Sequence, residues 1–504
     1  MQLFLIFLHK IVQFFQYFKR LKVHFFQYFK IKIVLLFHHF KRLKVQLFQD
    51  FNTLLYSSLL CYNFTHKKGH PKLKNIFRLI NISNSEFRIP KFFIIFLFPL
   101  SVFSFLSCGS SSPVVIWTDR PEMVSYVEFF NVAQNKAKAV VVYKEKLASS
   151  LPPAKDEQNP DIVIGSFLRN SRIKKNFASL DRVFNRRGIN PDSIYAPLLE
   201  YGKINGRQYL IPLSFNMPMM IFAQKNHDLI PESMTIDPDR IRDSASLFNQ
   251  KSKENVFLRM GYAPSWDANF IFHMAKMNGI DFSEKGNVFS WNAYSLADTI
   301  EYTKKWSQDK NGGTSQEQDF AFKYLYAPSY KLVSSDRCLF AYIKSDDFFN
   351  ISSEQTENIA FHWLGKGDKI FVNDDMTSLG LYRKTKNSHS AYEFINWFFS
   401  EATQKNLLER ALRMDLDTQT FGICSGLSSI KSVNERVFPS FYKTLLGKMP
   451  AESNLVAPLP LPSRWESLKE RVIIPYLSEV TSTDSTVAIK SMDERIAAWR
   501  NQFN

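Results

Sequence analysis

From residue 114 onward, short β-branched segments alternate with helical segments, and this order restricts the possible folds more than any other feature. The segments PVVIWTD, AVVVYKE and Asp161–Gly165 have the composition of buried strands. Met123, Val127 and Phe130 are spaced for one face of a helix between the first two. Such alternation predicts an α/β fold with a parallel sheet covered by helices. Farther on, GRQYLIPLSFNMPMMIFAQK is broken at Ser214–Pro218, where we expect the chain to cross into a second domain.

Beyond this break the patterns are mainly helical. NFIFHMAKMNGIDF is a helix ended by Gly279, and SLADTIEYTKKWSQDKNGG is another, ended by Asn-Gly-Gly. SAYEFINWFFSEATQKNLLERAL is the strongest helical candidate, with Phe394, Trp397 and Phe398 on one side. CLFAYIK and KIFVNDD are strand-like. We expect the helix-borne Trp306 and Trp397 to lie in the core.

The net charge of +17 comes mostly from the head of the chain. Residues 1–107 contain 16 lysines and arginines but only two acids, Asp50 and Glu86. The chain has 64 basic and 47 acidic residues, so residues 108–504 contain 48 basic and 45 acidic ones. A body this close to neutral argues against nucleic acid as a partner.

The head, residues 1–87, contains four consecutive eleven-residue blocks that begin at Phe14 with FFQYFKRLKVH. One interpretation is a continuous helix with a slight right-handed drift, suited to a membrane surface. The other is translation of a tandem DNA repeat upstream of the true gene. We favour the second because the composition is that of AT-rich DNA and because an export signal follows the repeat.

That signal covers residues 88–107. Arg88 and Lys91 precede an apolar run from Phe92 to Ser107, which is short for a membrane span and of the right length for a signal peptide. Cys108 follows the small Ser107 as in a lipobox, although Phe105 and Leu106 depart from the usual pattern. Residues 108–113 then form a lipid-bearing cysteine and a flexible tether. We expect an exported protein anchored by lipid to the outer face of the cell membrane, in the periplasm or at the cell surface.

Replacing this cysteine tests the anchor. Cys108→Ala should leave the precursor unprocessed, and mass spectrometry of the native protein should find a chain that begins at Cys108. Normal maturation of the variant would reject lipidation, and peptides from FFQYFKRLK in the native protein would show that the head is retained.

No catalytic motif is present. Gly-x-Ser-x-Gly, His-Glu-x-x-His, phosphate-binding and dinucleotide-binding patterns are all missing from the sequence, and six of the ten histidines lie at or before His70. We therefore expect a binding protein, with no metal and no cofactor. Cys338 and Cys424 either form a disulfide or lie apart as small buried residues, and the second is the commoner case.

The order of segments resembles the extracellular solute-binding proteins of ABC transporters, family 1, sugar-binding type, from Val114 to Leu477. The elements that carry the resemblance are Trp117-Thr118-Asp119, PDIVIG at 160–165, the crossing YLIPLSFNMPMMIF, the helix with Trp266, and AYEFINWFFSEATQKNL with its Gln404. The resemblance implies a two-lobed, class II periplasmic-binding-protein-like fold. Each lobe would be a mostly parallel sheet flanked by helices, with hinge strands between the lobes. We expect the first part of lobe 1 at 114–215, lobe 2 at 216–345, and the return to lobe 1 with C-terminal helices at 346–504.

Sugar receptors stack aromatic rings on C–H faces and offer carboxylates and amides to hydroxyls. Four loci combine or supply such groups at strand ends or loops, where a parallel sheet places its ligands. The candidates are Trp117 with Asp119, Phe215 with Asn216, Trp266 with Asp267, and Asp346 after the strand CLFAYIK. Each has a structural alternative: Trp117 in the core, Asp119 as a helix cap, and Phe215 with Asn216 in a turn.

The leading hypothesis is a monomeric, lipid-anchored protein that carries a sugar or similar solute to ABC permease subunits. The alternative is a surface lipoprotein that binds a protein partner with the same fold. A carbohydrate hydrolase is a third, less favoured class.

Overall fold

In the computed structural model, the structure describes residues 112–170, 173–185, 188–286, 288–414, 420–484 and 488–502. They belong to a compact unit, Cys108–Asn504. The head at 1–87, the signal peptide at 88–107 and Cys108 lie outside the described residues. No helix in the described part of the chain is both long and apolar enough to cross a membrane.

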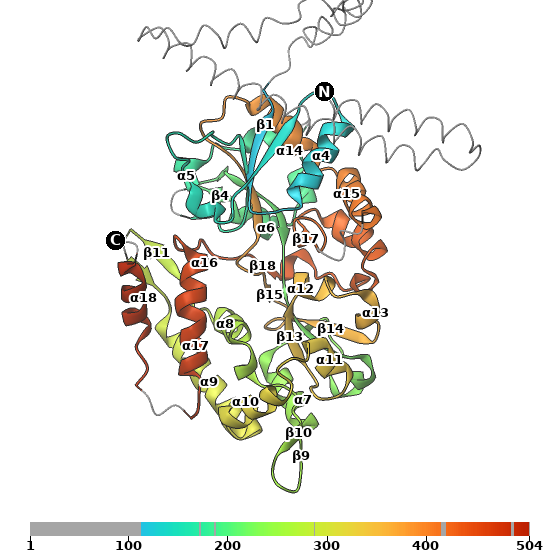
Figure 1. Cartoon of the computed structure of the whole chain (residues 1–504), viewed down its shortest axis with the longest axis vertical. Coiled ribbons are helices and arrows are strands. Elements are labelled where there is room, and N and C mark those ends of the chain that lie inside the picture. Colours follow the sequence, from blue (N-terminus) through green and yellow to red (C-terminus); the bar gives the residue numbers. More distant parts are fainter. Residues whose placement is uncertain are drawn as a thin grey trace, which may run out of the picture. The chain divides into compact units, whose positions relative to one another are not determined.

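The first lobe is built around a six-stranded sheet (Figure 1). Its order is β17-β6-β16-β3-β1-β2. The strands are β1 (Val114–Thr118), β2 (Ala139–Tyr143), β3 (Ile162–Gly165), β6 (Leu210–Phe215), β16 (Thr377–Leu381) and β17 (Leu427–Ser428). The three early strands match those predicted from the sequence.

Only two of the five strand pairs in this sheet are parallel, so the prediction of mostly parallel sheets needs correction. β1 pairs in parallel with β2 and β3, whereas the β3–β16, β16–β6 and β6–β17 pairs are antiparallel. The reason lies in the connections. Helix α4 (Met123–Ala133) joins β1 to β2, and a loop with the short turn η2 (Leu147–Ser150) joins β2 to β3. In contrast, β6 leads out of the sheet towards the second lobe and β16 returns from it, so these neighbours must run in opposite directions.

The second lobe is built around a four-stranded sheet of order β13-β7-β14-β8. Its strands are β7 (Pro218–Ala223), β8 (Thr235–Ile236), β13 (Ala341–Lys344) and β14 (Ile359–Leu364). Only the β14–β8 pair is parallel, because β13 and β14 both run opposite to β7. Since β14 follows residue 345, the second lobe extends beyond the expected boundary at that residue.

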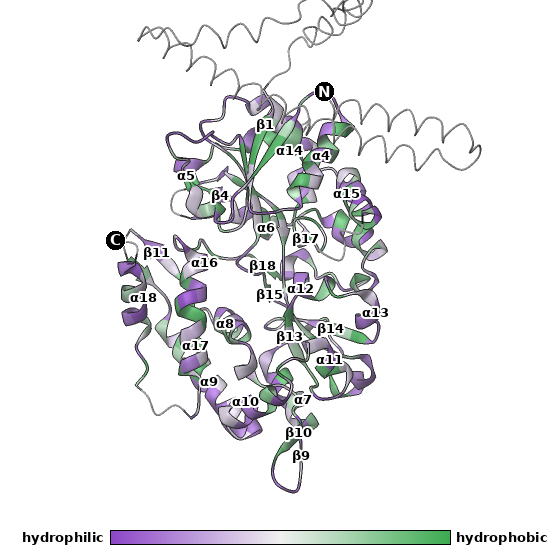
Figure 2. Ribbon diagram, in the orientation of Figure 1, coloured by the Kyte–Doolittle hydropathy of each residue, from purple (hydrophilic) through white to green (hydrophobic). Residues whose placement is uncertain are grey.

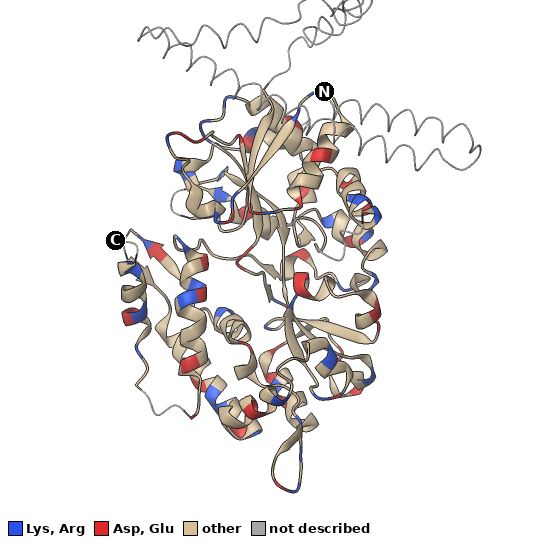
Figure 3. Cartoon of the chain, viewed as in Figure 1, with Lys and Arg blue, Asp and Glu red and all other residues tan. Residues whose placement is uncertain are grey.

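The first sheet separates two apolar layers, and its strands are largely green in Figure 2. In β1, Val114 and Ile116 face one core cluster while Val115 and Trp117 face the other. Helix α4 (Met123–Ala133) covers the first face, with its predicted Met123, Val127 and Phe130 all buried. Charged residues occur mainly in the surrounding helices and loops (Figure 3).

The predicted helix at 390–412 is divided in two. Helix α14 (Ser388–Phe398) ends before Ser400, whose extended backbone (φ −86°, ψ 131°) precedes α15 (Glu401–Arg413). Serine followed by an acid is a common helix start, so the break has a local cause. Gln404 is buried, and its Oε1 accepts a hydrogen bond from Ser428 Oγ at 2.6 Å.

The C-terminal segments pack on the second lobe. They comprise α16 (Trp465–Leu468), η11 (Lys469–Ile473), α17 (Ile474–Val480) and α18 (Met492–Asn501). Trp465 lies 6.2 Å, between ring centres, from Phe272 of α8 (Ala268–Met277), and Trp499 lies 6.2 Å from Phe289. The C-terminal segments therefore stabilise the second lobe, most of which is formed by the middle of the sequence.

Candidate functional site

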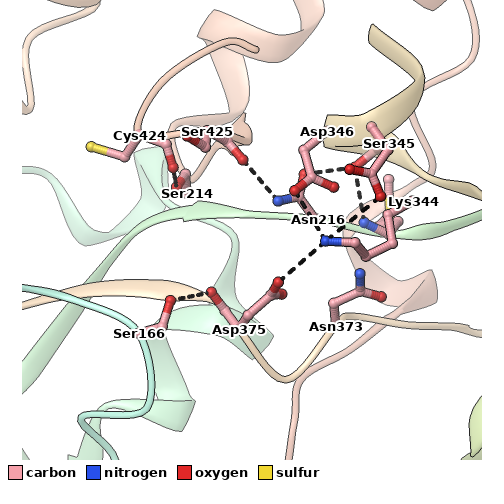
Figure 4. A network of polar contacts seen from close by, with 12 residues as sticks. Ser166, Ser214, Asn216, Lys344, Ser345, Asp346, Asn373, Asp375, Cys424 and Ser425 are labelled. Atoms are coloured by element: carbon pink, nitrogen blue, oxygen red, sulfur yellow. Dashed lines mark hydrogen bonds and ion pairs between the residues drawn. The ribbon is translucent and has the colours of Figure 1, made fainter. Parts of the chain in front are cut away.

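The two sheets are joined by Asn216–Met217, between β6 and β7, and by residues 372–376, between β15 (Ile370–Phe371) and β16. These crossings touch, because Asn373 N donates to Asn216 O at 2.9 Å. The Asn216 side chain donates to Ser425 O at 2.8 Å and accepts from Ser345 Oγ at 2.7 Å (Figure 4). The side-chain amide of Asn216 thus connects the first lobe to the end of β13. Asn216, which the sequence predicts as a ligand contact, lies at the crossing between the two sheets.

Lys344, the last residue of β13, is surrounded by carboxylates. Its Nζ lies 3.2 Å from Asp346, 3.7 Å from Asp375 and 3.8 Å from Asp347. Burial favours the neutral amine, but the three carboxylates outweigh burial and raise the pKa of Lys344 to about 12. The Lys344–Asp375 pair joins a second-lobe strand to the segment entering the first lobe.

The first lobe contributes Asp119, at the end of β1. Its Oδ2 accepts from Ser166 N at 3.1 Å, and its Oδ1 lies 3.3 Å from Arg120 Nε. Ser166 Oγ donates to Asp375 O at 2.7 Å, and Arg120 donates to the same hydroxyl. Asp119, Asn216 and Asp346 therefore belong to one polar network. Asp119 does not cap α4, whose N-cap residue is Glu122.

Four buried carboxylate oxygens of this network have no hydrogen-bond partner among the described residues. They are Asp346 Oδ1, Asp375 Oδ1, Glu122 Oε2 and Asp119 Oδ1, the last of which lies 3.3 Å from Arg120 Nε as an ion pair. The other Glu122 oxygen accepts from Ser425 Oγ at 2.9 Å. A buried acceptor without a donor costs about 1–3 kcal/mol, so these oxygens favour a ligand that brings donors.

Trp266 is the last residue of η6 (Pro264–Trp266), and Asp267 separates η6 from α8. The half-buried Trp266 ring stacks on Phe320 with centres 5.7 Å apart, and its Nε1 donates to Glu317 O at 3.0 Å. Asp267 caps α8 by accepting from Asn269 N at 2.8 Å. Burial raises the pKa of Asp267, and the charge of Asp347 adds to that rise.

Trp117 and Phe215, both predicted to contact ligand, lie in the core. Each is 1% exposed. Trp117 packs with Val115, Val163 and other residues of the smaller cluster, beneath Lys144. Phe215 meets Tyr195 edge-on at 5.5 Å. β-Strand alternation explains this correction, since both side chains point into apolar layers and only the polar residues that follow them reach the crossing.

The sequence analysis missed Arg120, Glu122, Lys344, Asp347 and Asp375. The signal was present in the run KIFVNDD, where polar residues follow a strand end as they do at Asp119 and Asp346. Lys344 and Asp375 are 31 positions apart in the sequence, and only the pairing of β13 with β7 and the return of β16 bring them together.

The cluster predicts a pH effect. Burial, reinforced by Asp375 and Asp347 and opposed by Lys344, raises the pKa of Asp346 from 3.8 to about 6. Folding thus favours the protonated form, so this contribution to stability is full below about pH 4 and is lost as the pH rises to about 6. Asp346→Asn should reduce the fall in unfolding free energy across this range in denaturant titrations. Burial is the main cause of the shift, so the more exposed Asp347→Asn should keep most of this fall, and equal slopes in both variants would contradict the assignment.

Cys338 and Cys424 are both buried and free. This confirms the prediction that the two cysteines lie apart as small buried residues and do not form a disulfide. No group of three or more His, Cys, Asp or Glu in the described ranges is arranged to hold a metal ion.

No protein-family model and no curated protein matches the sequence. Solved structures do match. An extracellular solute-binding protein family 1 structure from Alicyclobacillus acidocaldarius has a TM-score of 0.53 at 13% identity, covering 78% of this chain and 98% of that one. The galacto-N-biose-/lacto-N-biose I-binding protein of the ABC transporter of Bifidobacterium longum has a TM-score of 0.52 at 13% identity, covering 78% and 97%. CpMnBP1 with bound mannotriose has a TM-score of 0.52 at 12% identity, covering 78% and 100%. These likenesses confirm the predicted two-lobed solute-binding fold.

Proposed function

We propose that the protein is an exported solute-binding protein that holds a carbohydrate or similar polar solute between its lobes and releases it unchanged. The ligand would contact the crossing network from both sides, with Asp119 and Arg120 from the first lobe and Lys344 and Asp346 from the second. A ligand that touches both sets favours the arrangement in which they face it together. The fold shared with solute-binding proteins supports this proposal.

The observation that carries the proposal is the set of unpaired carboxylate oxygens on Asp346, Asp375 and Glu122. The half-buried ring of Trp266, stacked on Phe320, is the aromatic side chain that we assign to the same ligand. A sugar offers hydroxyl donors around a ring whose C–H faces pack on aromatic side chains. A sugar would therefore donate hydrogen bonds from its hydroxyls to the unpaired carboxylate oxygens and pack a ring face on the indole of Trp266. A purely apolar ligand would leave the carboxylates unpaired and is disfavoured.

Delivery to an ABC permease and anchoring through Cys108 form the finer part of the proposal. The signal peptide at 88–107 and the small polar residues after Cys108 support the anchor. Two ABC permease subunits are the partners that a protein of this fold would serve, and a monomer is sufficient because each chain contains both lobes.

A melting screen tests the proposal. The body (residues 109–504), mixed with a panel of mono- and oligosaccharides, should be stabilised by about 2.7 kcal/mol by a ligand at 100 times its Kd. Asp375→Asn should lose most of that stabilisation because it removes a carboxylate of the network. Stabilisation that is unchanged in this variant would place the ligand elsewhere, and no response to any sugar would reject the carbohydrate assignment.

One observation favours the alternative, a lipoprotein that binds a protein partner. Phe322 at the end of α10 (Thr314–Lys323), together with Leu325 and Tyr326, is 75%, 63% and 94% exposed. Exposed apolar groups of this size are often covered in a complex. Under this alternative, changing the three to serine would abolish partner binding, and the sugar panel would have no effect on melting.

A further inference from the structure

The second crossing, residues 372–376, is bonded to the second lobe at its start and gains a bond to the first lobe at Asp375. Up to Asp374 it is held by the second lobe: Lys276 of α8 donates to Val372 O at 3.0 Å and to Asp374 Oδ1 at 2.6 Å. At Asp375 the backbone O accepts from Ser166 Oγ of the first lobe, while the carboxylate lies 3.7 Å from Lys344 of the second lobe. Within this crossing, the contact with the first lobe therefore begins at Asp375, directly after the residue held by Lys276.

Asp374 has more partners than its neighbours. It is 4% exposed, and besides Lys276 it contacts Lys469 Nζ at 3.6 Å and accepts from Trp465 Nε1 at 3.1 Å. Burial alone would raise the pKa of Asp374, but the two lysines hold it far below its usual range, so the buried carboxylate is charged. Trp465 and Lys469 belong to the C-terminal segments, which thus take part in the crossing.

The neighbouring Asn373 extends this attachment. Its Oδ1 lies 3.0 Å from His273 Nε2 of α8, and its backbone N–H donates to Asn216 O in the first crossing. Burial and the charges of Lys276 and Lys469 lower the pKa of His273 to about 3, so the ring is neutral at physiological pH. Both crossings are therefore fixed to the same helix through adjacent residues.

We infer that Asp374 is a positioning residue and that Trp465 and Lys469 form with it a clamp that sets the angle at which the lobes meet. The inference rests on the proposed function in one respect, that the ligand is held by both lobes. Without the clamp, Asn373 and Asp375 would lose their fixed orientation, and fewer molecules would present Asp375 and Lys344 together. Apparent affinity falls in proportion to the fraction of molecules that are competent to bind.

The test measures the distance between the lobes by spin labels. The full chain, in detergent, carries Cys61→Ser and Cys108→Ser so that only two introduced cysteines are labelled. These are Val132→Cys in α4 and Leu247→Cys in α7 (Pro238–Phe248), positions 84% and 80% exposed. Without sugar, Asp374→Asn and Trp465→Phe should each broaden the distance distribution. With a sugar from the panel, Asp374→Asn should bind about five- to tenfold more weakly.

Two variants separate positioning from general stability. Asp374→Asn/Lys469→Met restores the net charge of the cluster but not the clamp, so its melting temperature should recover while its distances stay broad. Asp336→Asn removes a carboxylate 2.6 Å from Lys225 in the second lobe, away from the crossing, and should leave the distances narrow.

A narrow, wild-type distribution in the double variant would overturn the inference. Should Asp374→Asn fail to fold, Trp465→Phe, which changes no charge, decides the matter: a narrow distribution there would equally overturn it. The distances are measured without ligand. Failure of the wild-type chain to bind any sugar would reject the proposed function and leave the clamp to be judged by its own result.

Discussion

Trp266→Ala is expected to weaken sugar binding by roughly five- to 150-fold, on the order of 1–3 kcal/mol, while the body remains folded. Phe320 supports one face of the indole, and the bond from Nε1 to Glu317 O fixes its edge, so the ring is held ready for a ligand. Calorimetric titration of the variant with the sugar chosen by the melting screen measures the loss. Trp266→Phe, which keeps an aromatic face, should lose less.

Trp397 provides the matched control. It is also half-buried, but it packs on Phe129, Phe130 and Phe394 at 5.8, 5.1 and 5.7 Å between ring centres, where α14 meets α4 in the first lobe. Trp397→Ala should lower stability and leave affinity nearly unchanged in the folded fraction. The reverse pattern for Trp266→Ala, normal binding with early melting, would show that Trp266 is a core residue.

Trp117→Ala should cost about 3–5 kcal/mol of unfolding free energy. The side chain is 1% exposed among Leu147, Val163 and Leu168, and its Nε1 has no hydrogen-bond partner within the described residues. Its loss is therefore one of packing and leaves a cavity against the first sheet. Chemical denaturation measures the effect.

The affinity of the folded fraction decides between the two roles considered for Trp117. A core residue leaves affinity unchanged, and Trp117→Phe should recover part of the stability. A stable Trp117→Ala variant with weakened sugar binding would contradict its placement in the core and restore the role predicted from the sequence.

Local patterns were enough to predict much of the fold. The β-branched runs at 114–118, 139–143 and 162–165 form strands, and the apolar spacing of Met123, Val127 and Phe130 forms a buried helix face. The antiparallel half of each sheet was not predictable in this way. It depends on which strand returns from the other lobe, and β6 and β16 are separated by 161 positions between Phe215 and Thr377.

The site shows the same limit. Asp119, Asn216 and Asp346 could be singled out because polar residues follow strand ends, and the structure brings them into one polar network; their contact with a ligand remains a prediction. The aromatic partners at 117 and 215 were misassigned, since residue type alone does not say which sheet face a ring occupies. Lys344 and Asp375 were missed because a lysine and an aspartate 31 positions apart give no local signal of pairing.

A crystal structure of the body (residues 109–504) with the sugar chosen by the melting screen tests the central claim most directly. We predict the sugar between the lobes, with hydroxyls within hydrogen-bond distance of at least two of Asp346, Asp375 and Glu122 and a ring face against Trp266. A sugar bound elsewhere, with these three carboxylates still unpaired, would contradict the account.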